Sequence, residues 1–128
     1  MFDLTFDCVD AVRVAEFWKQ ALGYEDEPPP APFATRAEWL ATYGETYDPS
    51  GGAWLRDPAG VGPRLSILAV PEPKVAKNRL HIDVRCGGWD QVRAKVAELV
   101  AAGGTVLATY DGHHVTMADP EGNELCVG

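Results

Sequence analysis

The residues best suited to chemistry lie in one short stretch of the chain, Arg79–Val84. Apolar and polar residues alternate there, so as a strand it would have a core side and a side that carries His81 and Asp83. An imidazole beside a carboxylate can serve as a general base or bind a metal ion. The residues predicted to face the core are Leu80, Ile82 and Val84.

A second stretch near the start of the chain, Asp3–Cys8, follows the same pattern. In this copy Thr5 stands where His81 stands, and Asp7 matches Asp83. We interpret the chain as one structural unit written twice. The differences between the two copies therefore bear directly on function.

Composition limits the classes of protein that the chain can belong to. Its 128 residues suit a single domain, and 46% hydrophobic residues predict a folded core. A formal net charge of −8 disfavours nucleic acid and anionic membranes as partners. Three cysteines without a CxxC pair indicate reduced thiols, so we expect a cytoplasmic protein.

The elements that must position these residues fall into two halves joined by a proline-rich connector. We predict a first module over residues 1–70, with an insertion at 28–52, a linker at 71–78 and a second module over 79–128. Asp10 is a helix N-cap candidate, and Gly23 suits the end of that helix. Thr35 and Glu38 form a capping box that predicts a helix at 36–43. Strands are predicted at 2–8, 24–27, 53–56 and 64–70.

The second half repeats this order with a helix between strands. A helix is predicted from Trp89 to Val100, and Gly103 ends it. Asp111-Gly112 is a strong hairpin signal between two strands. A single module leaves one face of its sheet uncovered, so the two modules must pair. Strands are predicted at 79–85, 105–110, 113–118 and 124–127.

This order, with the turn Asp119–Asn123 before the last strand, resembles the vicinal oxygen chelate superfamily of glyoxalase I, bleomycin-resistance proteins and extradiol dioxygenases. Residues 70–83 and 119–126 look like its glyoxalase-like domain branch. The resemblance implies an α+β fold in which two βαβββ modules form a curved, mixed β-sheet cup. The site would lie inside the cup, often with a homodimer around it.

The resemblance also indicates where a metal ion would bind. In metal-dependent members, ligands come from the opening and closing strands of each module. The opening positions here are Thr5 and His81, and the second closing position is Cys126, where the enzymes have Glu. The first closing position falls within Leu65–Leu68, where only Ser66 is polar. His81 and Cys126 are fewer than the about three protein ligands of catalytic zinc, so we expect no cofactor, with a divalent metal as the alternative.

Several of these residues have an ordinary structural explanation. His81 could hydrogen-bond to Asp83 or Asp7, and Cys126 could be a small buried residue. Trp39, on the insertion, could cover a pocket or pack into the core. The candidate ligand-binding residues are Thr5, Asp7, Trp39, His81, Asp83, Glu124 and Cys126.

Three functions remain open from the sequence. The first is a binding protein, similar to bleomycin-resistance proteins, that holds a small organic molecule in its cup without a complete metal site. The second is a metal-dependent enzyme of the lyase, isomerase or dioxygenase type, with His81 as its catalytic residue. The third is a structural module whose cup is filled by its own side chains.

Overall fold

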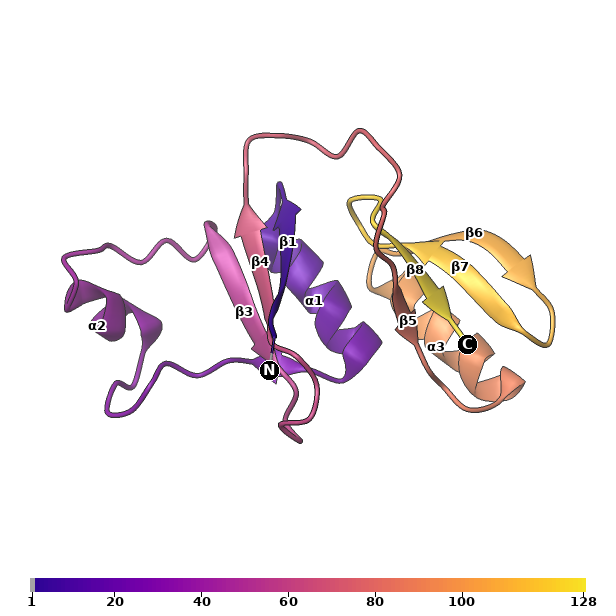
Figure 1. The fold of residues 1–128 in the computed structure, drawn as a ribbon, viewed down its shortest axis with the longest axis horizontal. Coiled ribbons are helices and arrows are strands. Elements are labelled where there is room, and N and C mark those ends of the chain that lie inside the picture. The colour runs from indigo at the N-terminus through magenta and orange to yellow at the C-terminus, as the bar shows by residue number, and fades with distance from the viewer. Residues whose placement is uncertain (1) are drawn as a thin grey trace.

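The first module is a four-stranded mixed sheet with one long helix packed against it (Figure 1). Our computed structural model describes residues 2–128. The sheet has the order β1-β4-β3-β2, in which β1 and β4 are parallel and the other neighbours are antiparallel. Its elements are β1 (Leu4–Cys8), α1 (Ala11–Leu22), β2 (Glu25–Asp26), α2 (Arg36–Ala41), β3 (Gly52–Arg56) and β4 (Leu65–Ala69).

The second module repeats the plan with the strand order β5-β8-β7-β6. Here β5 and β8 are parallel, and the remaining neighbours are antiparallel. The α+β fold of two βαβββ units is therefore confirmed, as two separate sheets with β1 and β5 at their inner edges in Figure 1. Its elements are β5 (Ile82–Val84), α3 (Trp89–Ala101), β6 (Thr105–Tyr110), β7 (His114–Ala118) and β8 (Glu124–Val127).

Local sequence signals set the ends of α1. The Asp10 side chain accepts a hydrogen bond from the Arg13 backbone N–H at 3.0 Å, which satisfies one of the free donors of the first turn. Gly23 ends the helix in the left-handed region, with φ of 69°. Both predictions are confirmed. One face of the helix, which includes Phe17 and Trp18, is fully buried.

Strand β5 is shorter than predicted, and this changes the position of its first residues. Pairing with β8 begins only at Ile82, opposite Leu125. The expectation that Leu80 packs in the core is wrong, since its side chain is 64% exposed. Residues 79–81 still belong to the linker that follows β4. The Glu124 side chain of β8 binds this linker at Asn78, before the hydrogen bonds between β5 and β8 begin.

A single apolar core joins the two modules. Phe17 of α1 lies so close to Gly104 that a Cβ at that glycine would be 2.6 Å from the ring. The indole N–H of Trp18 donates to the buried carboxylate of Asp119 at 3.1 Å. This hydrogen bond anchors the Asp119–Asn123 turn of the second module on α1 of the first module. Over residues 2–128, none of the helices is long and apolar enough to cross a membrane.

The insertion stands to one side of the first sheet (Figure 1). Its helix, α2, has the predicted capping box: Thr35 accepts from the Glu38 backbone N–H, and the Glu38 side chain accepts from that of Thr35. None of its residues is buried. Trp39 therefore lies outside the core, half-buried, with its ring edge-to-face against Tyr43 at 6.3 Å between centroids.

Candidate functional site

Strand register places the candidate residues on the face of each sheet that points away from its helix. In the first module, Thr5 is opposite Ser66, which is opposite Trp54. The intervening residues on these strands, such as Leu65 and Ile67, are buried in the core. We call the polar sides of the two sheets the open faces. The corresponding row of the second module is Asp83, Cys126 and Thr116.

His81 lies one residue before β5 and is exposed. Its Nε2 atom is 2.8 Å from the ammonium of Lys77, which is a donor only. Nε2 is therefore the acceptor in this contact. The expectation that His81 bonds to Asp83 or Asp7 is not met. A metal ion on Nε2 would have to displace Lys77.

Glu124 holds the linker against β8. Its carboxylate accepts the backbone N–H of Asn78 at 3.0 Å and lies 3.4 Å from the Lys74 ammonium. The Asn78 hydrogen bond lowers the pKa of the Glu124 carboxyl below its ordinary value, and Lys74 adds to this effect. Glu124 therefore remains an anion at neutral pH and positions the residues that precede His81.

Cys126 lies in a small cavity of about 190 Å³ on the open face of the second sheet. Its sulfur is 3.9 Å from the Thr116 hydroxyl. Two histidines at the end of the β6–β7 hairpin line the same cavity, and their Nδ1 atoms are 2.5 Å apart. Alternation along a strand predicts opposite directions for neighbouring residues, but His113 belongs to the turn. The cavity is lined by Asp83, Arg85, His113, His114, Cys126 and Gly128.

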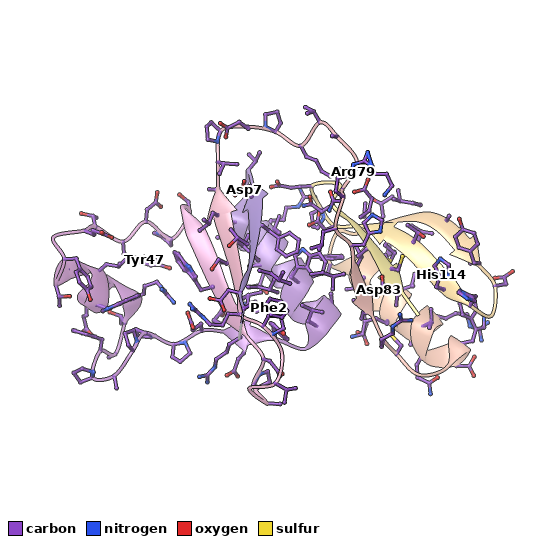
Figure 2. All side chains as sticks on the ribbon, viewed as in Figure 1. Phe2, Asp7, Tyr47, Arg79, Asp83 and His114 are labelled. Carbon is purple, nitrogen blue, oxygen red and sulfur yellow. The ribbon has the colours of Figure 1, made fainter. Side chains whose placement is uncertain are left out.

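A large groove lies between β1 and the linker and has a volume of about 620 Å³. Thr5 and Asp7 line it on one side, and Arg79 and the exposed Leu80 line it on the other. Figure 2 shows Asp7 and Arg79 on the two sides of the gap that the linker crosses. Within residues 2–128, neither side chain has an ion-pair partner of opposite charge. The other lining residues are Phe6, Cys8, Val70, Glu72, Pro73, Lys74, Asn78, Glu121 and Asn123.

The residues at the metal positions that the resemblance implies do not fit a metal ion in this chain. Thr5 and Ser66 are opposite one another in the first module and offer only hydroxyl groups. In the second module, Cys126 is level with Asp83, whereas His81 precedes the ladder and is bonded to a lysine. Among residues 2–128, no group of three or more His, Cys, Asp or Glu side chains could hold an ion.

Sequence reasoning missed one cluster on the open face of the first sheet. The guanidinium of Arg36 lies over the Trp54 ring and near the Glu27 carboxylate. Trp39, which was a candidate ligand contact, lines neither the large groove nor the Cys126 cavity. The only available signal was the position of Arg36 three residues before Trp39 on one helix, which does not identify Trp54 as a partner.

Known proteins share this architecture. Residues 3–128 match the sequence profile of the glyoxalase-like domain. Similar solved structures include a possible glyoxalase from Bacillus cereus, with a TM-score of 0.65 and 17% identity over 99% of this chain and 96% of that one. A glyoxalase/bleomycin resistance protein/dioxygenase family enzyme from Burkholderia phytofirmans PsJN has a TM-score of 0.64 and 18% identity over 97% and 93%.

The fosfomycin resistance protein FosX from Mesorhizobium loti is also similar, with a TM-score of 0.66 and 13% identity over 99% of this chain and 88% of that one. At these identities the likeness shows the fold alone. A search of curated proteins gave no match. The profile match over nearly the whole length leads to one conclusion: this chain belongs to the glyoxalase-like domain family.

Proposed function

We propose that the chain binds a small organic molecule in the groove between β1 and the linker, without a resident metal ion. The groove itself is the observation that carries this proposal. Its volume of about 620 Å³ lies in the range of small-molecule sites, which span about 300–1,000 Å³. Such sites combine apolar walls with a few polar groups that orient the ligand.

The groove has both kinds of surface. Leu80, 64% exposed in this structure, offers an apolar contact that a bound molecule would cover. Asp7 and Arg79 offer one negative and one positive group from different segments. A ligand with apolar carbon atoms and polar ends of either charge would complement these walls. Thr5 adds a hydroxyl that can donate or accept.

The proposed activity is sequestration rather than a reaction. Asp83, Cys126 and the exposed His81 lie outside the groove lining, and we propose that they contact larger ligands on the second open face. We also propose a homodimer, which the resemblance to glyoxalase-like proteins implies. The free cysteines Cys8, Cys86 and Cys126 support a reducing, cytoplasmic location.

A thermal-shift screen tests this proposal. The screen contains small organic molecules, including fosfomycin and bleomycin, which the names of similar proteins suggest. A compound at 100 times its Kd should stabilise the protein by about 2.7 kcal/mol. The shift should fall in Asp7→Asn and Arg79→Gln. It should be unchanged in Arg93→Gln, because Arg93 lies on α3 and pairs with Asp90 instead.

A parallel series with Zn²⁺, Mn²⁺, Ni²⁺ and Fe²⁺ separates this proposal from a metal enzyme. We expect no saturable stabilisation by these ions. A saturable shift that disappears in His81→Ala would overturn the metal-free proposal. An organic compound that binds equally well to wild type, Asp7→Asn and Arg79→Gln would show that the groove is not its site.

A further inference from the structure

A second cavity, of about 310 Å³, lies between α1, the insertion and β3. Trp54 and Tyr47 supply aromatic surface, and three carboxylates and two cations supply charge. This cavity and the large groove share no lining residue, so the inference drawn from it does not depend on the proposed function. The charged lining residues are Glu16, Asp26, Glu27, Lys19 and Arg36.

Arg36 occupies the aromatic side of this cavity. Its guanidinium carbon is 4.2 Å from the centroid of the Trp54 ring and 5.4 Å from that of Trp39. One guanidinium nitrogen lies 3.4 Å from both the backbone carbonyl and the carboxylate of Glu27. The side chain is only 13% exposed. An aromatic face beside a carboxylate is the combination that recognises organic cations.

The walls of this site are held more firmly than the arginine that fills it. Trp54 lies in the β3–β4 ladder, and its carbonyl accepts the Glu27 N–H at 2.8 Å. The Glu27 carboxylate is fixed by Arg64, whose guanidinium nitrogens lie 2.5 and 2.7 Å from it. Arg36, at 3.4 Å, makes the longer contact from a helix with no buried residue. The arginine is therefore the replaceable part.

The local charges favour a cation once Arg36 moves away. Lys19 is already paired with Glu16 at 2.5 Å and with Asp26 at 3.1 Å. Counting Arg64, which pairs with Glu27, the three carboxylates and three cations here sum to zero with Arg36 in place and to −1 without it. A guanidinium or alkylammonium ligand would restore the charge and the contact with Trp54.

We propose that Trp54 and Glu27 form a binding site for organic cations, and that Arg36 is its internal competitor, supplied by the 28–52 insertion. A ligand binds by displacing Arg36 from the indole face. Displacement costs the contact that Arg36 makes, which at the lower end of cation–π energies is about 1 kcal/mol. The ligand binds only to molecules in which Arg36 has left the indole face, so removal of Arg36 should raise the apparent affinity for an organic cation about fivefold.

The test uses butylguanidinium as the probe and butylurea, which has a similar shape but no charge, as its control. Binding is followed by NMR through the indole N–H signal of Trp54, assigned with Trp54→Phe. Arg36→Gln should bind butylguanidinium about fivefold more tightly than wild type. Arg56→Gln is the matched control. Arg56 lies on β3, the strand that carries Trp54, but its guanidinium pairs with Glu25 and not with Glu27. Its affinity should equal that of wild type.

Three results would overturn the proposal. These are no shift of the Trp54 signal in Arg36→Gln at about 20 mM probe, equal affinity in wild type and Arg36→Gln, and an equal response to butylurea. A probe concentration in this range detects even the weak affinity of a single desolvated cation–π contact. Glu27→Gln in the Arg36→Gln background should reduce binding again. The full indole spectrum shows whether each variant is folded.

Discussion

Replacing Asp119 with alanine should destabilise the protein by about 3–5 kcal/mol. The change removes a buried carboxylate that accepts several hydrogen bonds and leaves their donors without a partner. Asp119 is 2% exposed. It accepts hydrogen bonds from the Trp18 indole at 3.1 Å and from the backbone N–H groups of Glu121 and Asn123, both at 2.9 Å. The Asn123 side-chain amide donates a fourth at 2.9 Å.

The magnitude follows from the donors that would remain. Trp18 and Asn123 are themselves buried, so their N–H groups would lose a partner without gaining water. Each unsatisfied buried donor costs about 1–3 kcal/mol, and two or three of them give the predicted range. Since small domains are stable by about 5–15 kcal/mol, this loss is a large fraction of the total.

The two copies of the turn provide a matched control. Asp57 begins the corresponding turn of the first module. Among residues 2–128, it accepts only from nearby backbone N–H groups, those of Ala59, Val61 and Gly62. Asp57→Ala should therefore destabilise the protein much less than Asp119→Ala. Urea unfolding followed by far-UV circular dichroism measures both losses.

A double-mutant cycle isolates the contact between the modules. Trp18→Phe and Asp119→Ser, alone and combined, should give a coupling energy of about 1–2 kcal/mol. Asp119→Ser also serves as the milder variant if Asp119→Ala does not fold. Equal losses for Asp119→Ala and Asp57→Ala, or a coupling energy near zero, would refute the argument that this turn holds the modules together.

Three further changes test other parts of the fold. Burial raises the pKa of the Cys8 thiol from 9.0 to about 11, with Glu121 adding to the effect. As the pH rises, the thiol therefore ionises first in the unfolded chain, so this contribution to stability is complete below about pH 9 and is lost between pH 9 and 11. In urea titrations over this pH range, Cys8→Ala should lose less of its free energy of unfolding than wild type. Gly104→Ala should cost about 1–3 kcal/mol, because its Cβ would lie 2.9 Å from a backbone oxygen, whereas Gly88→Ala meets only the movable end of a glutamine and should cost less in the same assay. Glu124→Gln should speed cleavage of residues 71–78 in limited proteolysis, since the linker loses a charged acceptor, and an unchanged rate would argue against that anchor.

Much of the local structure could be predicted from the sequence. The cap at Asp10, the left-handed Gly23 and the Thr35 capping box all appear where the residues indicate. The Asp111-Gly112 hairpin also forms, with Gly112 at a φ of 72°. These features depend on contacts within about one turn of chain, so residue type and spacing are sufficient to specify them.

The candidate site was only partly predictable. Alternation grouped His81 with Asp83 but could not show that Asp83 pairs with Cys126 across a strand ladder. It placed Leu80 in the core incorrectly, since alternation cannot show where a ladder begins. It also separated His113 from His114, whose rings meet because His113 belongs to a turn. A periodic pattern describes a strand only within the limits of that strand.

The sequence by itself determined the duplicated order of strands and helices, because periodicity and turn chemistry are encoded locally. Only the tertiary structure decided which distant side chains meet: Asn78 with Glu124, Trp18 with Asp119, and Arg36 with Trp54. Each pair depends on the path of a linker, the packing of one module on another, or the docking of an insertion. These are global properties of the chain, set by the sum of many contacts, and no single segment specifies them.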